Sequence, residues 1–319
     1  MGRRTHAQLA LCNGHRELLN ILVRYGKGVM LLSQLRAICL ATGLYPSGQA
    51  VNRVVRKLRE ANVLTRQTWV DGNGDLVVAR KAVFEFLNNT NSRAVATPPR
   101  PATMAPYLAQ ARKIDWLLRV MEVHRPDSPD AIEKFLRGRG CTAFLRQSEL
   151  LDYYRRYKPY LSENKGVYEA EVRYLKGQEL RREHLARHLP PPENNVPQTV
   201  TLEQMHLRGI YIDGFSPSGK MICLIFFPNR NTSAGHIMDW AIDACWWIRG
   251  IFPGYQVKLT LHALDAAHKE SLKRSLEART RGQAYWRARL AEQKIEGMLH
   301  LSAYDSDFVD LWCCGVRSV

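Results

Sequence analysis

The residues best suited to chemistry lie on one short predicted helix, residues 48–60. Valine and leucine recur there at helical spacing and predict a buried stripe of Val51, Val54, Val55 and Leu58. Polar and basic residues fall on the opposite side. Arginine can pair with guanine, asparagine or glutamine with adenine, and lysine with phosphate. The helix and the serine before it therefore predict contacts with double-stranded DNA from Ser47, Gln49, Asn52, Arg53, Arg56, Lys57 and Arg59.

The neighbouring segments predict a frame that would hold this helix against DNA. Residues 30–40 form a predicted helix, residues 42–46 break it, and Ser47 has the chemistry of an N-cap. Apolar runs at residues 63–70 and 76–79 enclose an Asp-Gly-Asn-Gly turn, which favours a β-hairpin. This order is typical of a winged helix-turn-helix, whose wing would add the DNA contacts Arg66, Asn73 and Arg80. The alternatives are a solvated basic face and a winged helix that binds protein.

The distribution of charge agrees with a nucleic-acid partner. The 319 residues have a net charge of +16, and residues 1–98 hold 14 Lys and Arg against 5 Asp and Glu. Such an excess in one segment is the electrostatic footprint of a surface that binds phosphate. RNA or an anionic membrane would also attract it, but the sequence has neither an arginine–glycine repeat nor an amphipathic lysine-rich anchor.

The remaining composition indicates a cytoplasmic protein with no membrane partner. No apolar stretch has the length of a membrane span, and residues 1–6 do not begin a secretory signal. The 7 cysteines form no Cys-x-x-Cys pair, and most lie in apolar runs. We therefore expect a reducing compartment and no disulfide framework.

Two segments rich in proline and polar residues, 91–106 and 190–199, predict linkers in a multi-domain α+β protein. We expect a winged-helix domain at residues 1–90, a basic helical segment at 107–189 and an α/β domain at 200–319. Predicted helices of the middle segment lie at residues 107–124, 130–138, 146–157 and 165–188.

The middle segment carries two patterns that have ordinary explanations. His184 and His188 have the spacing of two metal ligands on a helix, but no third ligand accompanies them. The tyrosines and arginines of residues 153–160 could stack on nucleic acid. We favour a structural histidine pair and an amphipathic helix.

The last segment alternates strands and helices. Strands are predicted at residues 207–213, 220–227, 256–263, 295–302 and 308–315, and helices at 234–251 and 265–294. This order suits a mixed sheet flanked by helices.

A basic winged helix, a linker and a small α/β domain that opens on Ile210-Tyr211-Ile212-Asp213-Gly214 resemble the replication-relaxation family of mobile elements. The resemblance implies a C-terminal domain similar to restriction endonucleases, often with a degenerate active site. It also implies a role in the replication, transfer or regulation of a plasmid, phage or integrative element.

A nuclease of this kind needs an acidic residue at one strand end and an acid-x-Lys on the next strand, which together hold a divalent ion such as Mg²⁺. Asp213 has the position of the first acid, but the predicted strand 220–227 carries no carboxylate. Gln256 and Lys258 have the permitted Gln-x-Lys form, although a helix intervenes. We therefore expect no catalytic site and no cofactor, and we interpret Asp213 as a turn residue before Gly214.

Three functions remain from these patterns. The first is a DNA-binding protein of a mobile element that acts in replication, transfer or transcriptional regulation. Its domain at residues 200–319 would form a homodimer or bind a protein partner. The second is a Mg²⁺-dependent nuclease or nicking enzyme that uses Asp213, Gln256 and Lys258. The third is an adaptor in a nucleoprotein complex with an interface of Trp240, Trp246, Trp247 and Trp312.

Overall fold

The computed structural model describes residues 6–68, 75–88, 104–145, 149, 201–216, 220–228, 232–251, 255–263, 266–277 and 299–303. The chain divides into two compact units. The first contains residues 1–135 and 305–319, and the second contains residues 136–304. The fold is α+β, with helices and one small sheet in each unit.

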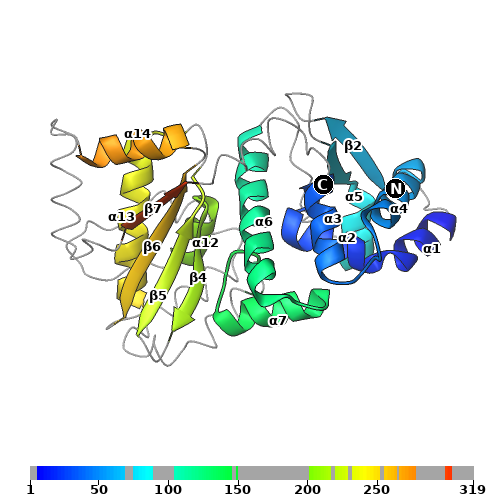
Figure 1. The fold of residues 1–319 in the computed structure, drawn as a ribbon, viewed down its shortest axis with the longest axis horizontal. Helices are drawn as coiled ribbons and strands as arrows, with labels where there is room; N and C mark the ends of the chain where they lie inside the picture. The colour runs from blue at the N-terminus through cyan, green and yellow to red at the C-terminus, as the bar shows by residue number, and fades with distance from the viewer. Residues whose placement is uncertain are drawn as a thin grey trace. The chain divides into compact units, whose positions relative to one another are not determined.

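Helices pack around a three-stranded sheet in the first unit (Figure 1). Its elements in chain order are α1 (His6–Gly14), α2 (Arg16–Gly26), β1 (Val29–Leu31), α3 (Leu32–Ala41), α4 (Gly48–Glu60), β2 (Leu64–Thr68), β3 (Asp75–Ala79), α5 (Lys81–Asn88) and α6 (Met104–His124). Helix α7 (Pro129–Arg139) begins in this unit and ends in the second.

The sheet of the first unit is antiparallel with the order β1-β3-β2. Strands β2 and β3 pair as the hairpin prediction requires, from Leu64 opposite Ala79 to Thr68 opposite Asp75. The predicted start of the helix at residue 30 was wrong. Met30 instead pairs with Val77 in the sheet, so α3 begins at Leu32.

Helix α6 is an integral part of the first unit. The buried side chain of Gln34 on α3 donates to the carbonyl of Ala111, at 3.0 Å, and to Oδ2 of Asp115, at 2.9 Å. Gln110 donates to the carbonyl of Tyr25 on α2. Since α6 packs on α2, α3 and β1, part of the predicted middle segment belongs to the N-terminal core.

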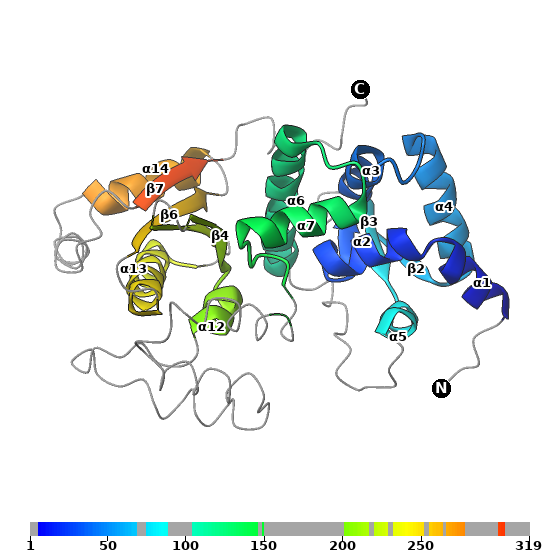
Figure 2. The ribbon, with the colours of Figure 1, turned by 90° about the horizontal axis from the view of Figure 1, so that it is seen from below.

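A four-stranded mixed sheet forms the centre of the second unit (Figure 2). Its elements are α12 (Thr201–Leu207), β4 (Ile210–Ser216), β5 (Met221–Phe226), α13 (Ala234–Ile251), β6 (Gln256–Ala263), α14 (Ala266–Glu277) and β7 (Leu299–Ala303). The order is β4-β5-β6-β7. The first pair is antiparallel and the other two are parallel, which confirms the predicted mixed sheet.

Helices α12 and α13 cover one face of this sheet (Figure 2). Alternate strand residues meet them in a core that includes Ile212, Leu224 and Leu259, as the period of two in a β-strand dictates. On α13 the side chains buried in this core include Ile237, Ala241, Ala244 and Ile248, which recur at helical spacing. Trp240 is half-buried, and the guanidinium of Arg208 lies 5.3 Å from its ring centroid.

Several predictions fall outside the described residues. They are the helices at 146–157 and 165–188 with His184 and His188, the residues 153–160, the linker at 190–199, residues 91–103 of the other linker, Asn73, Trp312, the strand at 308–315, and the side chains of Trp246 and Trp247. The last residues of the predicted linker 91–106 belong to α6, which begins at Met104. Among the helices that the structure describes, none combines the length and apolar character needed to cross a membrane.

Candidate nucleic-acid interface

One side of α4 presents an uninterrupted stripe of exposed polar and basic side chains. The stripe follows the helical spacing i, i+3, i+4, i+7 and i+8, and its members are Gln49, Asn52, Arg53, Arg56 and Lys57. Val51, Val55 and Leu58 on the other side are at most 1% exposed. Helix α3 lies between α4 and α6 (Figure 1 and Figure 2), so the long helix α6 does not cover the stripe.

Local contacts determine where α4 begins and how the preceding loop is held. Oγ of Ser47 accepts a hydrogen bond from the amide of Ala50 at 3.2 Å, so Ser47 is the N-cap. The hydroxyl of Tyr45 lies 2.9 Å from Nδ1 of His15 at the start of α2. Burial raises the pKa of Tyr45 to about 12, and burial together with the charge of Lys57 lowers the pKa of His15. Both groups are therefore neutral near pH 7.

Arg59 is held within the protein. Its Nη2 and Nη1 donate to the two carboxylate oxygens of Asp75 on β3, at 2.7 and 3.1 Å. This fork joins the end of α4 to the first residue of β3, at the turn end of the paired strands, so Arg59 contributes less open charge than its sequence position suggests. Asp75 was missing from the predicted site, because its role depends on the pairing of β2 with β3.

The other basic residues of the predicted site keep most of their surface. The side chain of Arg66 is 66% exposed and lies 3.5 Å from Oδ1 of Asp75. Arg56 lies 3.7 Å from Glu60, with both side chains more than two-thirds exposed. Exposed ion pairs of this kind contribute about 0–1 kcal/mol, so a phosphate can replace the carboxylate. Arg80 is also exposed.

The residues of the alternative nuclease site lie on two strands of the second unit, β4 and β6, which β5 separates. Asp213 is not a turn residue, so that prediction was wrong. It lies within β4, at an irregularity of register between Ile212 and Gly214. Arg139 donates from Nη2 to Oδ2 of Asp213, at 2.6 Å, and from Nε to its carbonyl oxygen, at 2.9 Å.

The carboxylate of Asp213 is largely buried, and its charge is paired with the guanidinium of Arg139. Burial raises its pKa, while the charge and hydrogen bond of Arg139 act in the opposite direction. Its Oδ1 is buried without a hydrogen-bond partner among the described residues. A metal ion at Oδ2 would have to compete with the guanidinium of Arg139.

Lys258 and Gln256 share a sheet with Asp213 but lie on β6, beyond β5. Lys258 is opposite Cys223 of β5, which is in turn opposite Gly214 of β4. The backbones of β4 and β6 are therefore about 10 Å apart, two strand spacings. In the part of the chain that the structure describes, no three His, Cys, Asp or Glu side chains form a group that could hold a metal ion.

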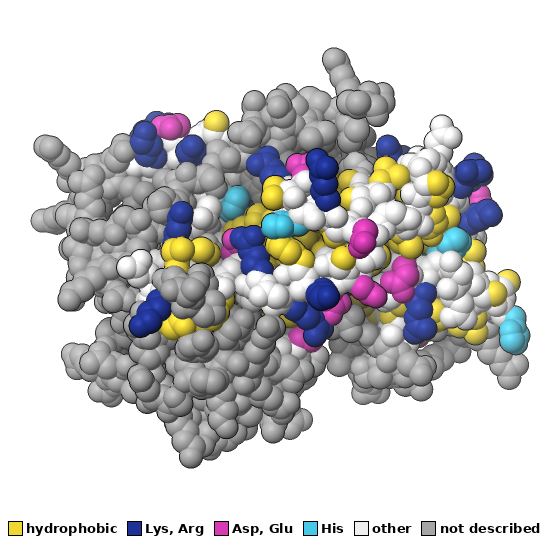
Figure 3. Space-filling view, turned by 60° about the horizontal axis from the view of Figure 1, so that its bottom comes forward, with side chains coloured by type: hydrophobic (Ala, Val, Ile, Leu, Met, Phe, Trp, Pro, Cys, Tyr) yellow, Lys and Arg dark blue, Asp and Glu magenta, His cyan; other side chains and the backbone are white. Residues whose placement is uncertain are grey.

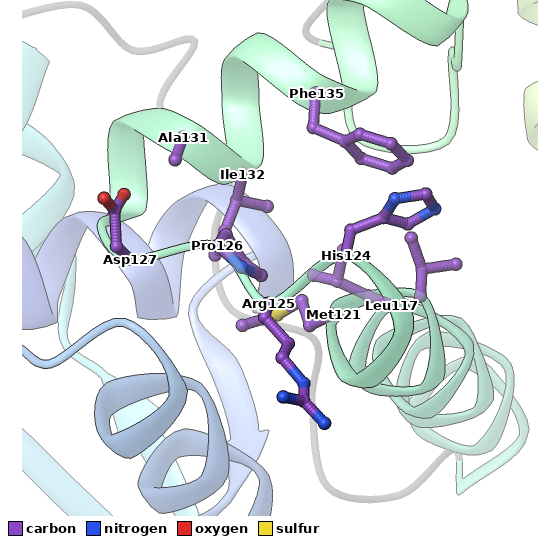
Figure 4. A pocket seen from close by; sticks show the side chains of 10 residues that line it. Leu117, Met121, His124, Arg125, Pro126, Asp127, Ala131, Ile132 and Phe135 are labelled. Atoms are coloured by element: carbon purple, nitrogen blue, oxygen red, sulfur yellow. The ribbon is translucent and has the colours of Figure 1, made fainter.

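A pocket of about 310 Å³ lies between the end of α6 and the start of α7 in the first unit (Figure 4). Leu117, Met121 and Ile132 form its buried apolar wall. The rings of His124 and Phe135 face each other on one side, with centroids 4.0 Å apart. Sequence patterns did not indicate this pocket, because its walls come from two helices.

No protein-family model, curated protein or solved structure matches this chain. On the face that Figure 3 shows, Lys and Arg side chains alternate with Asp and Glu side chains. The stripe on α4 differs from such a mixed surface, because from Gln49 to Lys57 it contains no acidic residue.

Proposed function

We propose that the protein binds double-stranded DNA through a winged helix-turn-helix in its first unit. In this proposal α4 enters the major groove, and β2 and β3 form the wing. The stripe on α4 is the observation that carries the proposal. It combines groups that read base edges, Gln49, Asn52 and Arg53, with Lys57 as a contact for phosphate.

The cap and packing of α4 support a role in DNA recognition over that of a scaffold helix with a solvated basic face. A capped helix held by buried valines presents its side chains in a fixed register, as readout of base edges requires. The fork between Arg59 and Asp75 also fixes the helix against the hairpin. The resemblance to replication-relaxation proteins makes the replication or transfer of a mobile element the setting that we propose.

Selection of bound duplexes from a random pool by the full chain tests the proposal. We expect one enriched motif. Arg53→Ala and Arg56→Ala should each weaken binding by about 1–3 kcal/mol if the residue contacts a base, and should relax sequence preference there. Arg125→Ala, which removes an exposed arginine outside α4, is the control. Unchanged binding by the Arg53→Ala/Arg56→Ala double variant would refute the proposal.

For the α/β domain that the sequence predicts at residues 200–319 we propose assembly rather than catalysis. Residues 196–319 hold 14 Lys and Arg against 12 Asp and Glu, a balance that favours contact with protein more than with phosphate. A dimer would read inverted repeats, one half-site for each protomer. Sedimentation equilibrium of the full chain measures the oligomeric state, and a monomer bound to a single half-site would refute this part.

The nuclease alternative is tested in the same selection. Asp213 is engaged by Arg139, and its proposed partners lie on β6 beyond an intervening strand. We therefore expect duplexes to stay intact with and without Mg²⁺. Nicking that requires Mg²⁺ and is lost in Asp213→Asn would restore the alternative.

A further inference from the structure

We propose that Arg36 on α3, a residue outside the predicted DNA contacts, binds a backbone phosphate at the beginning of α4. The inference rests on the proposed function and adds to it a contact that fixes the register of α4 on the duplex. Arg36 makes no hydrogen bond or ion pair with any residue that the structure describes. Its Nε is buried and unbonded.

The guanidinium of Arg36 lies directly against the first residue of α4. A Cβ atom on Gly48 would be 3.1 Å from Nε, 3.4 Å from Nη2 and 3.5 Å from Cζ of Arg36. Gly48 has ordinary helical geometry, so its small size matters here for the space that it leaves. The glycine lets an arginine from another helix reach the start of α4.

The guanidinium of Arg36 extends the exposed stripe of α4 beyond the N-terminal end of that helix. Gly48, Asn52 and Arg56 form one row at the spacing i, i+4 and i+8, since residues four apart lie above one another on a helix. Arg36 therefore stands at the N-terminal end of that row. No carboxylate among the described residues neutralises it, in contrast to Arg59 at the other end of α4.

A phosphate is the ligand that fits this environment. An arginine guanidinium presents several donors in a planar fork that matches phosphate oxygens. No residue that the structure describes satisfies a donor of this guanidinium, which favours a ligand that supplies acceptors to the Nη atoms, because an unsatisfied donor is costly. The contact carries no sequence information, so its loss should weaken binding to every duplex alike.

Two variants test the contact by different routes. Arg36→Gln removes the charge, and we expect the slope of log Kobs against log salt to fall by about 0.9. The ratio of the wild-type binding constant to that of Arg36→Gln should then shrink about 3.5-fold between 50 and 200 mM salt. Arg36→Lys keeps the charge and should keep most of the slope.

Gly48→Ala leaves the charge in place but displaces the guanidinium. We expect weaker binding together with unchanged or higher stability, because alanine favours a helix more than glycine does. Gly14→Ala is the matched control, since a Cβ there would meet nothing within 4 Å. Poor folding would instead lower both stability and binding.

The outcomes separate this inference from the proposed function. If Arg53→Ala weakens binding while Arg36→Gln changes neither affinity nor salt slope, the phosphate contact is refuted and the DNA interface stands. If Arg36→Gln alters the preferred sequence, the residue reads bases and the assignment to phosphate is refuted. If the wild-type chain binds no duplex, both proposals fail.

Discussion

Removal of Arg139 should lower the free energy of unfolding, because it leaves the largely buried carboxylate of Asp213 without its partner. The side chain of Asp213 is 17% exposed and that of Arg139 is 34% exposed. Removing one partner of a fully buried pair costs about 3–5 kcal/mol. Water can still reach the position of Arg139, so we expect Arg139→Met to lower the free energy of unfolding by about 2–3 kcal/mol.

The cost should depend on pH in a defined direction. Burial raises the pKa of Asp213, so the folded protein takes up a proton there more readily than the unfolded chain does. The penalty for the charged form is therefore complete above the raised pKa and disappears as the pH falls through it. Arg139→Met removes the opposing influence and raises this pKa further. The difference in stability between wild type and variant should therefore be largest above the raised pKa of Asp213 in the variant, and should shrink as the pH falls through it.

A double-mutant cycle measured by urea denaturation of the full chain tests this reasoning. Asp213→Asn removes the buried charge and should cost about 1 kcal/mol or less, because Arg139 remains partly hydrated. In the Asp213→Asn background, Arg139→Met should then cost much less than it does alone. Hydrogen exchange at Ile212, whose amide donates to Oγ1 of Thr142 at 2.9 Å, reports on this region of β4. Additive costs with no dependence on pH would refute the argument.

Three further predictions concern the first unit. Arg66→Ala should lower the salt slope of DNA binding by about one, because this exposed side chain has a loose contact of 3.5 Å with Asp75; an unaltered slope would assign Arg66 another role. Asp75→Asn should strengthen binding to non-specific DNA at low salt by releasing Arg59, while lowering the free energy of unfolding by about 1–2 kcal/mol. Weaker DNA binding together with lower stability would contradict this. Gln34→Ala should cost about 1–3 kcal/mol of unfolding free energy, measured against the exposed control Gln49→Ala, and equal losses would mean that Gln34 does not join α3 to α6.

The sequence alone was sufficient for the parts of the fold that rest on local periodicity. Helix α4 begins at Gly48, as the serine cap predicted. Of the predicted apolar stripe, Val51, Val55 and Leu58 are buried and Val54 is half-buried. Strands β4, β5 and β6 and helix α13 were also predicted, with shifts of a few residues at their ends. These elements are strongly amphipathic or apolar, so packing reinforces what the local pattern favours.

The prediction failed where a residue from a distant segment determines the local structure. Asp-Gly usually marks a turn, yet Asp213 and Gly214 continue β4. Arg139, 74 residues earlier in the chain, binds both the carboxylate and the carbonyl of Asp213. A Cβ on Gly214 would lie 3.1 Å from Nε of Arg139, so the glycine makes room for this side chain. A local pattern contains no information about such a partner.

The same reasoning explains why the candidate interface differs from the one read from the sequence. Periodicity sorts the residues of α4 by side, but it cannot show which arginines are already neutralised. Asp75 occupies Arg59 at the C-terminal end of α4, while α3 places the unpaired Arg36 beside Gly48 at the other end. The open positive charge is therefore displaced toward the N-terminus of α4. A duplex bound there would be held by the charges that tertiary structure leaves free. A count of the arginines in α4 therefore overestimates the positive charge that its C-terminal half offers to DNA.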